Sequence, residues 1–457
     1  MHANPTARRC AAAAAATLFV ALAGCGPRAA GLLDDGDAGG AQDTSAAAAA
    51  ATPARYLPAS RAGIGDIFGL DIRTVQFGIR GLELSEPIVE LGGAADLLLS
   101  FDVIGDEVRQ FRYDLTHCDA NWEPSVLTPI EYLTSFSEAD VTEYDLSFNA
   151  VTDYTHFELV LPNQYVSWTK SGNYLLNVYD DASGELEMRL RFCVVEPLVR
   201  LAVDQTRPGA VAKDKTHQEF DVAVSLRETR LENPRRSLSL TVLQNGDWRT
   251  GLYGVPPRFL RGEQLQWDYQ DRIVFPAMRE WRALDLRTLE TAGGRVREVT
   301  REGEVFSAFL FPEKPRANFP PETRIDLNGG FVIEDFDNRF RLQAEYARTI
   351  FSLATARDES IEPLYLYGAL TGYRLDGENR GVYNELTGAY MFSAPLKQGF
   401  YNYAYVSAGE NGLRPVWTET EGDWFQTENA YQFLLYYRPY GQRYDRLIGY
   451  EYVQVNR

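Results

Sequence analysis

The chain has 457 residues, of which 45% are hydrophobic and 12% aromatic, and its 64 acidic and 45 basic residues give a formal net charge of −19. This composition is too apolar for a disordered chain, and the length is too great for one ordinary domain, so two or three folded domains are expected. A surface this acidic repels a phosphate backbone, which excludes nucleic acid as an expected partner. No run of 18 or more apolar residues occurs, so no membrane-spanning helix is predicted.

The first segment has the pattern of a lipoprotein signal peptide. Two arginines precede an apolar stretch at residues 11–23, which has the length of a signal-peptide core. The stretch ends in Leu22-Ala23-Gly24-Cys25, which resembles the bacterial lipobox, where cleavage before the cysteine is followed by its acylation. We therefore expect residues 1–24 to be removed and Cys25 to carry the lipid, with an ordinary secretory peptide as the alternative.

The residues after Cys25 predict a location and a tether. Gly26 stands where some bacteria place the aspartate that retains a lipoprotein at the inner membrane, and no acidic cluster of the surface-exported kind follows directly. The expected location is the outer membrane, lipid-anchored through acyl chains and facing the periplasm. Residues 25–60 are mostly Ala, Gly, Asp and Pro with no aromatic residue before Tyr56, so this stretch is predicted to be a disordered tether.

Residues 61–197 are predicted to form an antiparallel β-sandwich of immunoglobulin-like size. Several short stretches alternate apolar and polar residues, as half-buried strands do. These stretches are Leu97 to Val103, Phe111 to Leu115, Phe157 to Leu161, Tyr174 to Val178 and Met188 to Val194. The gaps hold turn residues such as Ser171-Gly172-Asn173, and strands separated by such turns are typical of a sandwich.

Two further β modules are predicted, a middle one at residues 198–318 and an aromatic-rich C-terminal one at residues 319–457. Prolines mark their edges, and period-two stretches continue through both. Strands are expected at Phe220 to Val224, Leu238 to Val242, Phe340 to Tyr346 and Tyr401 to Tyr405. The predicted fold class is therefore all-β, with two or three stacked antiparallel β-sandwich domains after the lipoprotein signal and tether.

Residues that carry chemistry are scarce. The histidines beyond the signal region are His117, His156 and His217, and none has metal-ligand spacing to a second histidine or a cysteine. His117 continues the apolar face of its strand and is expected to be a hydrogen-bonded core residue, and the other two are expected at the surface or at strand ends. Paired carboxylates for glycoside hydrolysis converge only in three dimensions, so the sequence leaves that alternative open, but candidates such as Glu428, Asp423 and Glu334 are ordinary in so acidic a chain. We expect no enzyme activity, no catalytic residues, no metal and no cofactor.

Cys118 and Cys193 are the thiols that remain after lipidation. By strand parity both side chains point away from the apolar face of their strands. In an oxidising compartment they pair as a disulfide if their strands are adjacent, and the sequence leaves this open.

Several stretches carry distinctive motifs. In the first module these are His117-x-Asp119-x-Asn121-Trp122-x-Pro124-Ser125, Glu131-Tyr132-Leu133, Tyr154-Thr155-His156, Leu161-Pro162-Asn163 and Ser171-Gly172-Asn173-Tyr174. Near the C-terminus they are Gly368-Ala369-Leu370-Thr371-Gly372-Tyr373, Lys397-Gln398-Gly399-Phe400-Tyr401-Asn402-Tyr403, Glu421-Gly422-x-Trp424-Phe425-Gln426-Thr427-Glu428-Asn429, Tyr436-Tyr437-Arg438 and Arg443-Tyr444-Asp445-Arg446-Leu447-Ile448-Gly449-Tyr450. With these motifs, the chain from about residue 60 to residue 452 resembles the type IX secretion system plug protein family of Bacteroidota.

The resemblance implies a periplasmic plug that docks on the outer-membrane type IX translocon barrel and keeps its wide pore closed. Aromatic and arginine side chains near the C-terminus have the makeup of interface anchors. The candidate partner-binding residues are Trp424, Phe425, Arg438, Arg443, Tyr444 and Arg446. For any single aromatic residue, a place in the core is the alternative.

The rival function is a lipid-anchored outer-membrane protein that binds carbohydrate. β-sandwiches in that setting stack sugars on exposed aromatic rings, and Trp122, Trp168, Trp417 and Trp424 are candidates for such a platform. A platform needs exposed, coplanar rings in a row, whereas the aromatic residues of a plug lie in the core or in one broad patch.

Overall fold

The computed structural model describes residues 65–134, 136–321, 326–338, 341–361, 363–409 and 414–456. The expected signal peptide, the tether and Cys25 lie outside the described residues. Strands dominate the described part, and its α-helices, Pro129–Tyr132 (α1) and Pro234–Ser237 (α2), are single turns. The all-β prediction is therefore confirmed.

The N-terminal sandwich packs two sheets around one core. One sheet has the order β1-β10-β9-β5-β6, with β3 beside β10, and the other has the order β2-β4-β8-β7. Its strands are Gly65–Ile67 (β1), Ile72–Ile79 (β2), Ile88–Glu90 (β3), Leu97–Ile104 (β4), Phe111–Cys118 (β5), Glu138–Val141 (β6), Glu143–Leu146 (β7), Tyr154–Leu161 (β8), Gly172–Asp180 (β9) and Leu186–Val195 (β10). Leu97, Leu99 and Phe101 alternate along β4 and are fully buried, as their spacing predicts.

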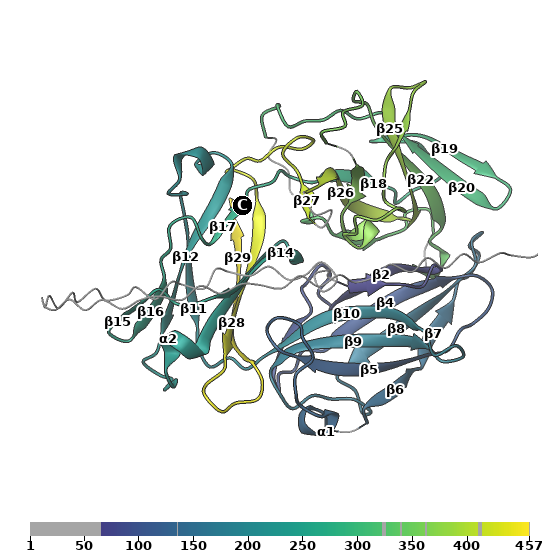
Figure 1. Cartoon of the computed structure of the whole chain (residues 1–457). Helices are drawn as coiled ribbons and strands as arrows, with labels where there is room; N and C mark the ends of the chain where they lie inside the picture. The colour runs from purple at the N-terminus through teal and green to yellow at the C-terminus, as the bar shows by residue number, and fades with distance from the viewer. Residues whose placement is uncertain are drawn as a thin grey trace, which may run out of the picture. The chain divides into compact units, whose positions relative to one another are not determined.

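The middle sandwich takes strands from two distant parts of the chain. One sheet has the order β11-β12-β16-β15, with β17 beside β12, and the other has the order β14-β13-β28-β29. Its strands are Leu201–Thr206 (β11), His217–Ser225 (β12), Leu238–Gln244 (β13), Asp247–Val255 (β14), Phe259–Arg261 (β15), Gln264–Trp267 (β16), Val274–Pro276 (β17), Asn429–Tyr437 (β28) and Arg446–Val455 (β29). A 3₁₀ turn, Val211–Lys213 (η2), precedes β12. In Figure 1 the yellow strands β28 and β29 lie among the teal strands of this sandwich.

The inserted sandwich lies in the chain between β17 and β28. Its sheets have the orders β18-β26-β21, with β23 and β27 beside β26, and β19-β20-β22-β25-β24. Its strands are Arg282–Asp285 (β18), Val296–Glu302 (β19), Val305–Leu310 (β20), Phe331–Ile333 (β21), Tyr346–Leu353 (β22), Leu364–Tyr367 (β23), Val382–Asn384 (β24), Ala389–Lys397 (β25), Gly399–Ala408 (β26) and Pro415–Val416 (β27). Two 3₁₀ turns, Arg341–Gln343 (η3) and Ala369–Thr371 (η4), belong to it.

Two sequence predictions are wrong at this level. The division at residues 318 and 319 does not separate two modules, because Tyr431, Phe433 and Leu435 of β28 complete the core of the middle sandwich. Of the strand expected from Phe340 to Tyr346, Phe340 lies outside the described residues, Arg341–Gln343 form η3, and β22 begins only at Tyr346. Period-two spacing of Leu342, Ala344 and Tyr346 therefore does not report a strand before Tyr346.

Candidate functional site

The loop that joins β28 to β29, residues 438–445 (the hairpin loop), lies against the N-terminal sandwich. Arg438 donates from Nη1 to Asp119 Oδ2 at 3.0 Å. Its Nη2 donates to the backbone oxygen of Arg443 at 3.0 Å, which holds the loop closed. The backbone N–H of Ala120 donates to Asp445 Oδ2 at 3.0 Å. The loop is thus bonded at both of its ends.

Arg443 ties the hairpin loop to α1. Its Nη1 donates to Glu131 Oε1 at 2.6 Å, and its Nη2 donates to the backbone oxygen of Val126 at 2.8 Å. Glu131 also caps α1, because the backbone N–H and the hydroxyl of Thr128 donate to Oε2 at 2.8 and 2.9 Å. The Thr128 backbone, the Thr128 hydroxyl and the Arg443 guanidinium together hold the pKa of Glu131 below its usual range.

Arg446 completes the attachment at the start of β29. Its Nε and Nη2 donate to the two carboxylate oxygens of Glu196 at 2.7 to 3.1 Å, which is a bidentate pair. The backbone continues the contact, since the N–H groups of Glu196 and Leu198 donate to the oxygens of Leu447 and Ile448. The connection between the N-terminal and middle sandwiches therefore pairs with β29.

Tyr444 packs on His117, with 5.3 Å between the ring centroids. His117 is buried; its Nδ1 lies 2.8 Å from Ser125 Oγ and its Nε2 lies 3.2 Å from the Ser171 oxygen. Burial lowers the pKa of His117, which agrees with a neutral core histidine. Gly172 has φ +136°, and a Cβ there would lie 2.7 Å from His117 Nε2, so the site requires glycine.

The other two predicted anchors lie at the opposite end of β28. Trp424 and Phe425 are half-buried, and their backbone N–H groups donate to the oxygens of Met278 and Lys215. The guanidinium of Arg207 lies 4.6 Å from the Phe425 ring centroid. The six predicted partner-binding residues therefore form two separate groups, and each group holds parts of this chain together.

The sequence prediction missed the side chains that the hairpin loop and its seat expose. Tyr440 in the loop is 100% exposed, and Ile130 of α1 is 88% exposed. Val126, whose oxygen binds Arg443, also has an exposed side chain. Neither alternation nor motif spacing singles these residues out, because their exposure depends on how the loop packs.

The sequence leaves the pairing of Cys118 and Cys193 open, and in the structure the two buried residues are not joined to each other. Both are register partners of Asn173, Cys118 on β5 and Cys193 on β10, so β9 lies between them. Two strand spacings are about 9.5 Å, whereas a disulfide needs Cα atoms less than about 7 Å apart. Their side chains do lie on the same face, as parity predicted, in one buried cluster.

The aromatic platform for carbohydrate does not form from the four expected tryptophans. Trp122, Trp168 and Trp417 are buried. Trp122 packs edge-on against Trp248, with ring centroids 4.7 Å apart. These rings are core residues, so they offer no coplanar exposed row for a sugar.

The position predicted for His156 is also wrong, because this residue is buried and does not lie at the surface. Its Nδ1 lies 2.6 Å from Asp102 Oδ1, and Asp102 Oδ2 accepts from Lys397 Nζ at 2.7 Å and from Tyr346 Oη at 2.6 Å. Burial alone would raise the pKa of Asp102, but the His156 and Lys397 contacts outweigh it and hold that pKa below its usual range. Lys397 and Tyr346 come from β25 and β22, so the cluster joins the N-terminal and inserted sandwiches.

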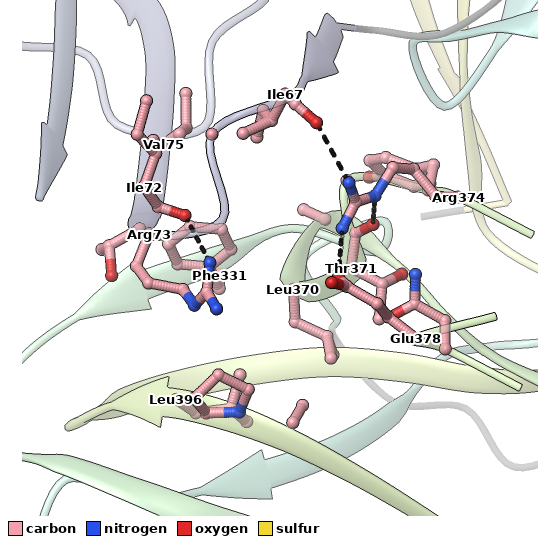
Figure 2. Close-up of a pocket in the computed structure, with 18 of the residues that line it drawn as sticks. Ile67, Ile72, Arg73, Val75, Phe331, Leu370, Thr371, Arg374, Glu378 and Leu396 are labelled. Atoms are coloured by element: carbon pink, nitrogen blue, oxygen red, sulfur yellow. Dashed lines mark hydrogen bonds and ion pairs between the residues drawn. The ribbon is translucent and has the colours of Figure 1, made fainter. Parts of the chain in front are cut away.

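A cavity of about 470 Å³ lies beside this cluster, between β2 and the η4 and β25 region. Figure 2 shows Arg374 at one wall, where it donates to the Ile67 oxygen at 3.1 Å and to Glu378 Oε2 at 3.1 Å. The walls are mostly apolar, with Ile72 and Leu396 on opposite sides.

The described residues contain no group of three or more His, Cys, Asp or Glu side chains placed to hold a metal ion. No helix in the described part of the chain is long and apolar enough to cross a membrane.

Comparison with known proteins identifies a family domain in this chain and a solved structure of similar fold. Residues 72–196 match the family described as type 9 secretion system plug protein 1st domain. A crystal structure of a hypothetical protein from Parabacteroides merdae is similar with a TM-score of 0.82 and 28% identity, covering 86% of this chain and 99% of that one. The C-terminal domain of the Streptococcus pyogenes antigen I/II-family protein AspA matches with a TM-score of 0.14 and 10% identity over 84% of this chain and 99% of that one. A TM-score this low does not indicate a shared fold. No curated protein matches the chain.

Proposed function

We propose, from the match of residues 72–196 to the type 9 secretion system plug protein 1st domain, that the protein is a periplasmic plug that docks on the outer-membrane translocon and closes its pore. The domain itself associates the chain with type IX secretion. The role of the stopper is a binding role, and we propose that the protein is not an enzyme. In this proposal the lipid on Cys25 holds the plug at the periplasmic face of the outer membrane.

The observation that best supports a stopper is the way distant parts of the chain are bonded together. Arg446 binds Glu196, Arg443 binds Glu131, and Lys397 binds Asp102, and each pair is more than 200 residues apart in sequence. Such contacts hold the sandwiches in fixed contact, and a stopper must resist deformation when it covers a wide opening. Arg438, Arg443 and Arg446, which the sequence predicts to bind the translocon, also bond parts of this chain to one another.

The C-terminal region would then contribute to docking through what the hairpin loop exposes. Tyr440 is fully exposed and lies in a loop that is bonded on both sides. An exposed tyrosine on a bonded loop is a good interface anchor because its large ring has only two side-chain torsions to fix on binding. A stopper that spans a pore contacts its rim at more than one place, so this loop need not be the sole contact.

The test is copurification of the tagged protein with the translocon from its own envelope, together with the permeability of the envelope in a strain that lacks it. We expect copurification and a leak to large solutes in the deletion strain. Tyr440→Ala should weaken docking by about 2 kcal/mol with unchanged thermal stability, whereas Leu386→Ala, at a 98% exposed side chain of the inserted sandwich, serves as the matched control.

An intact protein that never copurifies with the translocon, joined to a deletion strain without a leak, would contradict the plug assignment. Mass spectrometry of the envelope form tests the anchor, and an unmodified N-terminus at a residue other than Cys25 would overturn that part alone.

A further inference from the structure

β7 is an edge strand of the N-terminal sandwich. It stands last in the order β2-β4-β8-β7, and β8 is the strand paired with it in the described part of the chain. All four of its residues, Glu143–Leu146, are exposed. Figure 1 shows β7 at the margin of its sheet. Edge strands of this kind offer unpaired backbone groups to another strand.

The register identifies which backbone groups face outward. Asp145 is opposite His156, and the N–H of Ser147 donates to the Tyr154 oxygen at 2.8 Å. Alternate residues of an antiparallel ladder point to the same neighbour, so the N–H and C=O groups of Tyr144 and Leu146 point away from β8. The next outward N–H, that of Phe148, is taken by the Leu342 oxygen at 3.0 Å.

The two faces of β7 differ in chemistry. Tyr144 is opposite Phe157 of the core, with the ring centroids 5.7 Å apart, yet it remains 51% exposed. Leu146 lies on the same face and is 56% exposed. This face therefore continues the apolar interior to the open edge of the sandwich, where a further strand could cover it.

The opposite face of β7 is acidic. Glu143 is directly opposite Glu158 of β8, whose side chain is 44% exposed. Asp145 lies two residues along on the same face and is also exposed. Like charges placed opposite each other on a ladder repel, so a neighbouring strand with positive charge would relieve this repulsion.

We propose that the β7 edge binds an extended segment of the docking partner, in which apolar residues alternate with lysine or arginine. The apolar side chains of that segment cover Tyr144 and Leu146, and its basic side chains face Glu143, Asp145 and Glu158. Its backbone pairs with the outward N–H and C=O groups of Tyr144 and Leu146. This inference rests on the proposed docking function, because it names the chemistry of one contact with the translocon.

The acidic face also explains why the edge does not recruit other strands at random. Charged side chains on an edge discourage pairing with neutral or acidic strands, including a second copy of the same acidic edge. The same charges favour pairing with a basic strand. The acidic side chains therefore both discourage unwanted strand pairing and select a basic partner.

A peptide that alternates valine and lysine is the probe for the full folded protein, and a peptide that alternates valine and glutamate is its control. We expect binding of the lysine peptide, weakening as salt is raised, and at least about tenfold weaker binding of the glutamate peptide. Glu143→Lys should reduce or reverse this preference. Equal binding of both peptides, or no binding of either, would overturn the inference.

Two variants test whether the lysine peptide binds at β7. Leu146→Pro removes an outward N–H while leaving the bonds to β8, so it should abolish peptide binding without unfolding the sandwich. Leu146→Lys should weaken binding at least about tenfold, whereas Val382→Lys, the same kind of change on the exposed edge strand β24, should not. Thermal unfolding of each variant confirms that it is folded, and a folded Leu146→Pro variant that still binds would contradict the proposal.

The envelope experiment separates this inference from the proposed function. If the unaltered protein copurifies with the translocon and Leu146→Lys loses that association while Val382→Lys keeps it, the plug function and the β7 inference both stand. If all three copurify equally, the plug function stands and the β7 inference fails. If the unaltered protein does not copurify, the plug function fails, and the peptide measurement alone decides whether the edge selects basic strands.

Discussion

At the scale of single residues, Glu86 is a carboxylate held where an uncharged group would fit better. Gln432 Nε2 donates to its Oε1 at 3.3 Å, and its carboxylate closely approaches Gly246, which has φ +69°. Burial raises the pKa of Glu86 from 4.5 to about 7. The folded protein therefore holds a proton on Glu86 at a pH where the unfolded chain has lost it.

This shift predicts a pH-dependent stability. Because the folded pKa lies above the unfolded one, stability falls as pH rises from about 4.5 to about 7 and the loss persists at higher pH. Glu86→Gln should raise the free energy of unfolding by about 1 to 3 kcal/mol at pH 8 and leave it unchanged below about pH 4.5. Denaturant unfolding at several pH values measures this, and Glu90→Gln, at an exposed carboxylate of β3, is the control. An equal gain at pH 4 and pH 8 would show a cause other than ionisation.

For single residues, the sequence predicts burial but not the bonding partner. The spacing of Leu97, Leu99 and Phe101 predicts their burial, because period two reports which face of a strand is covered. Arg446 was predicted as a partner-binding residue, and in the structure it binds Glu196, 250 residues away in the same chain. Side-chain type predicts the kind of bond, and only the fold decides the partner.

At the scale of elements, strand faces were predictable but strand neighbours were not. β13 and β28 each show an alternating or apolar pattern, yet nothing in either sequence says that the two strands pair. The same limit explains why the pairing of Cys118 and Cys193 was left open. Strand parity predicted that the two side chains share a face, but it did not predict that β9 lies between their strands. The β7 edge was missed for the related reason that an edge is defined by the absence of a neighbouring strand.

The pairing of β13 with β28 predicts how fragments behave. A fragment of residues 198–318 lacks β28 and β29, and with them Tyr431, Phe433 and Leu435 of the core. It should remain unfolded, because half of one sheet and a large share of the buried apolar surface are missing. Adding a peptide of residues 429–456 to a fragment of residues 198–276 should restore β structure, as measured by circular dichroism and protease resistance. A folded, protease-resistant 198–318 fragment would contradict this account.

At the scale of the whole molecule, the buried cluster around Asp102 couples the N-terminal and inserted sandwiches. Lys397→Met leaves the Asp102 carboxylate buried with one cation fewer, which should cost about 3 kcal/mol or more. The double variant Asp102→Asn/Lys397→Met should recover most of this loss, since the uncompensated charge is gone. Calorimetry should show one unfolding transition for the unaltered protein and an earlier, separate one for Lys397→Met. Two well-separated transitions in the unaltered protein would mean that the sandwiches are not coupled.

The pairing of Leu238 with Tyr437 joins positions 199 residues apart, and this has a consequence for the order in which the molecule forms. A growing chain completes the N-terminal sandwich early, because all ten of its strands precede Leu201. The middle sandwich cannot form until β28 has been synthesised, so the apolar face of β13 stays uncovered until then. Long-range pairings of this kind also form slowly. Any chain that ends before β28 stays permanently open and becomes a substrate for proteases and chaperones. A chain that lacks β28 and β29 is therefore expected to leave the apolar face of β13 and β14 uncovered.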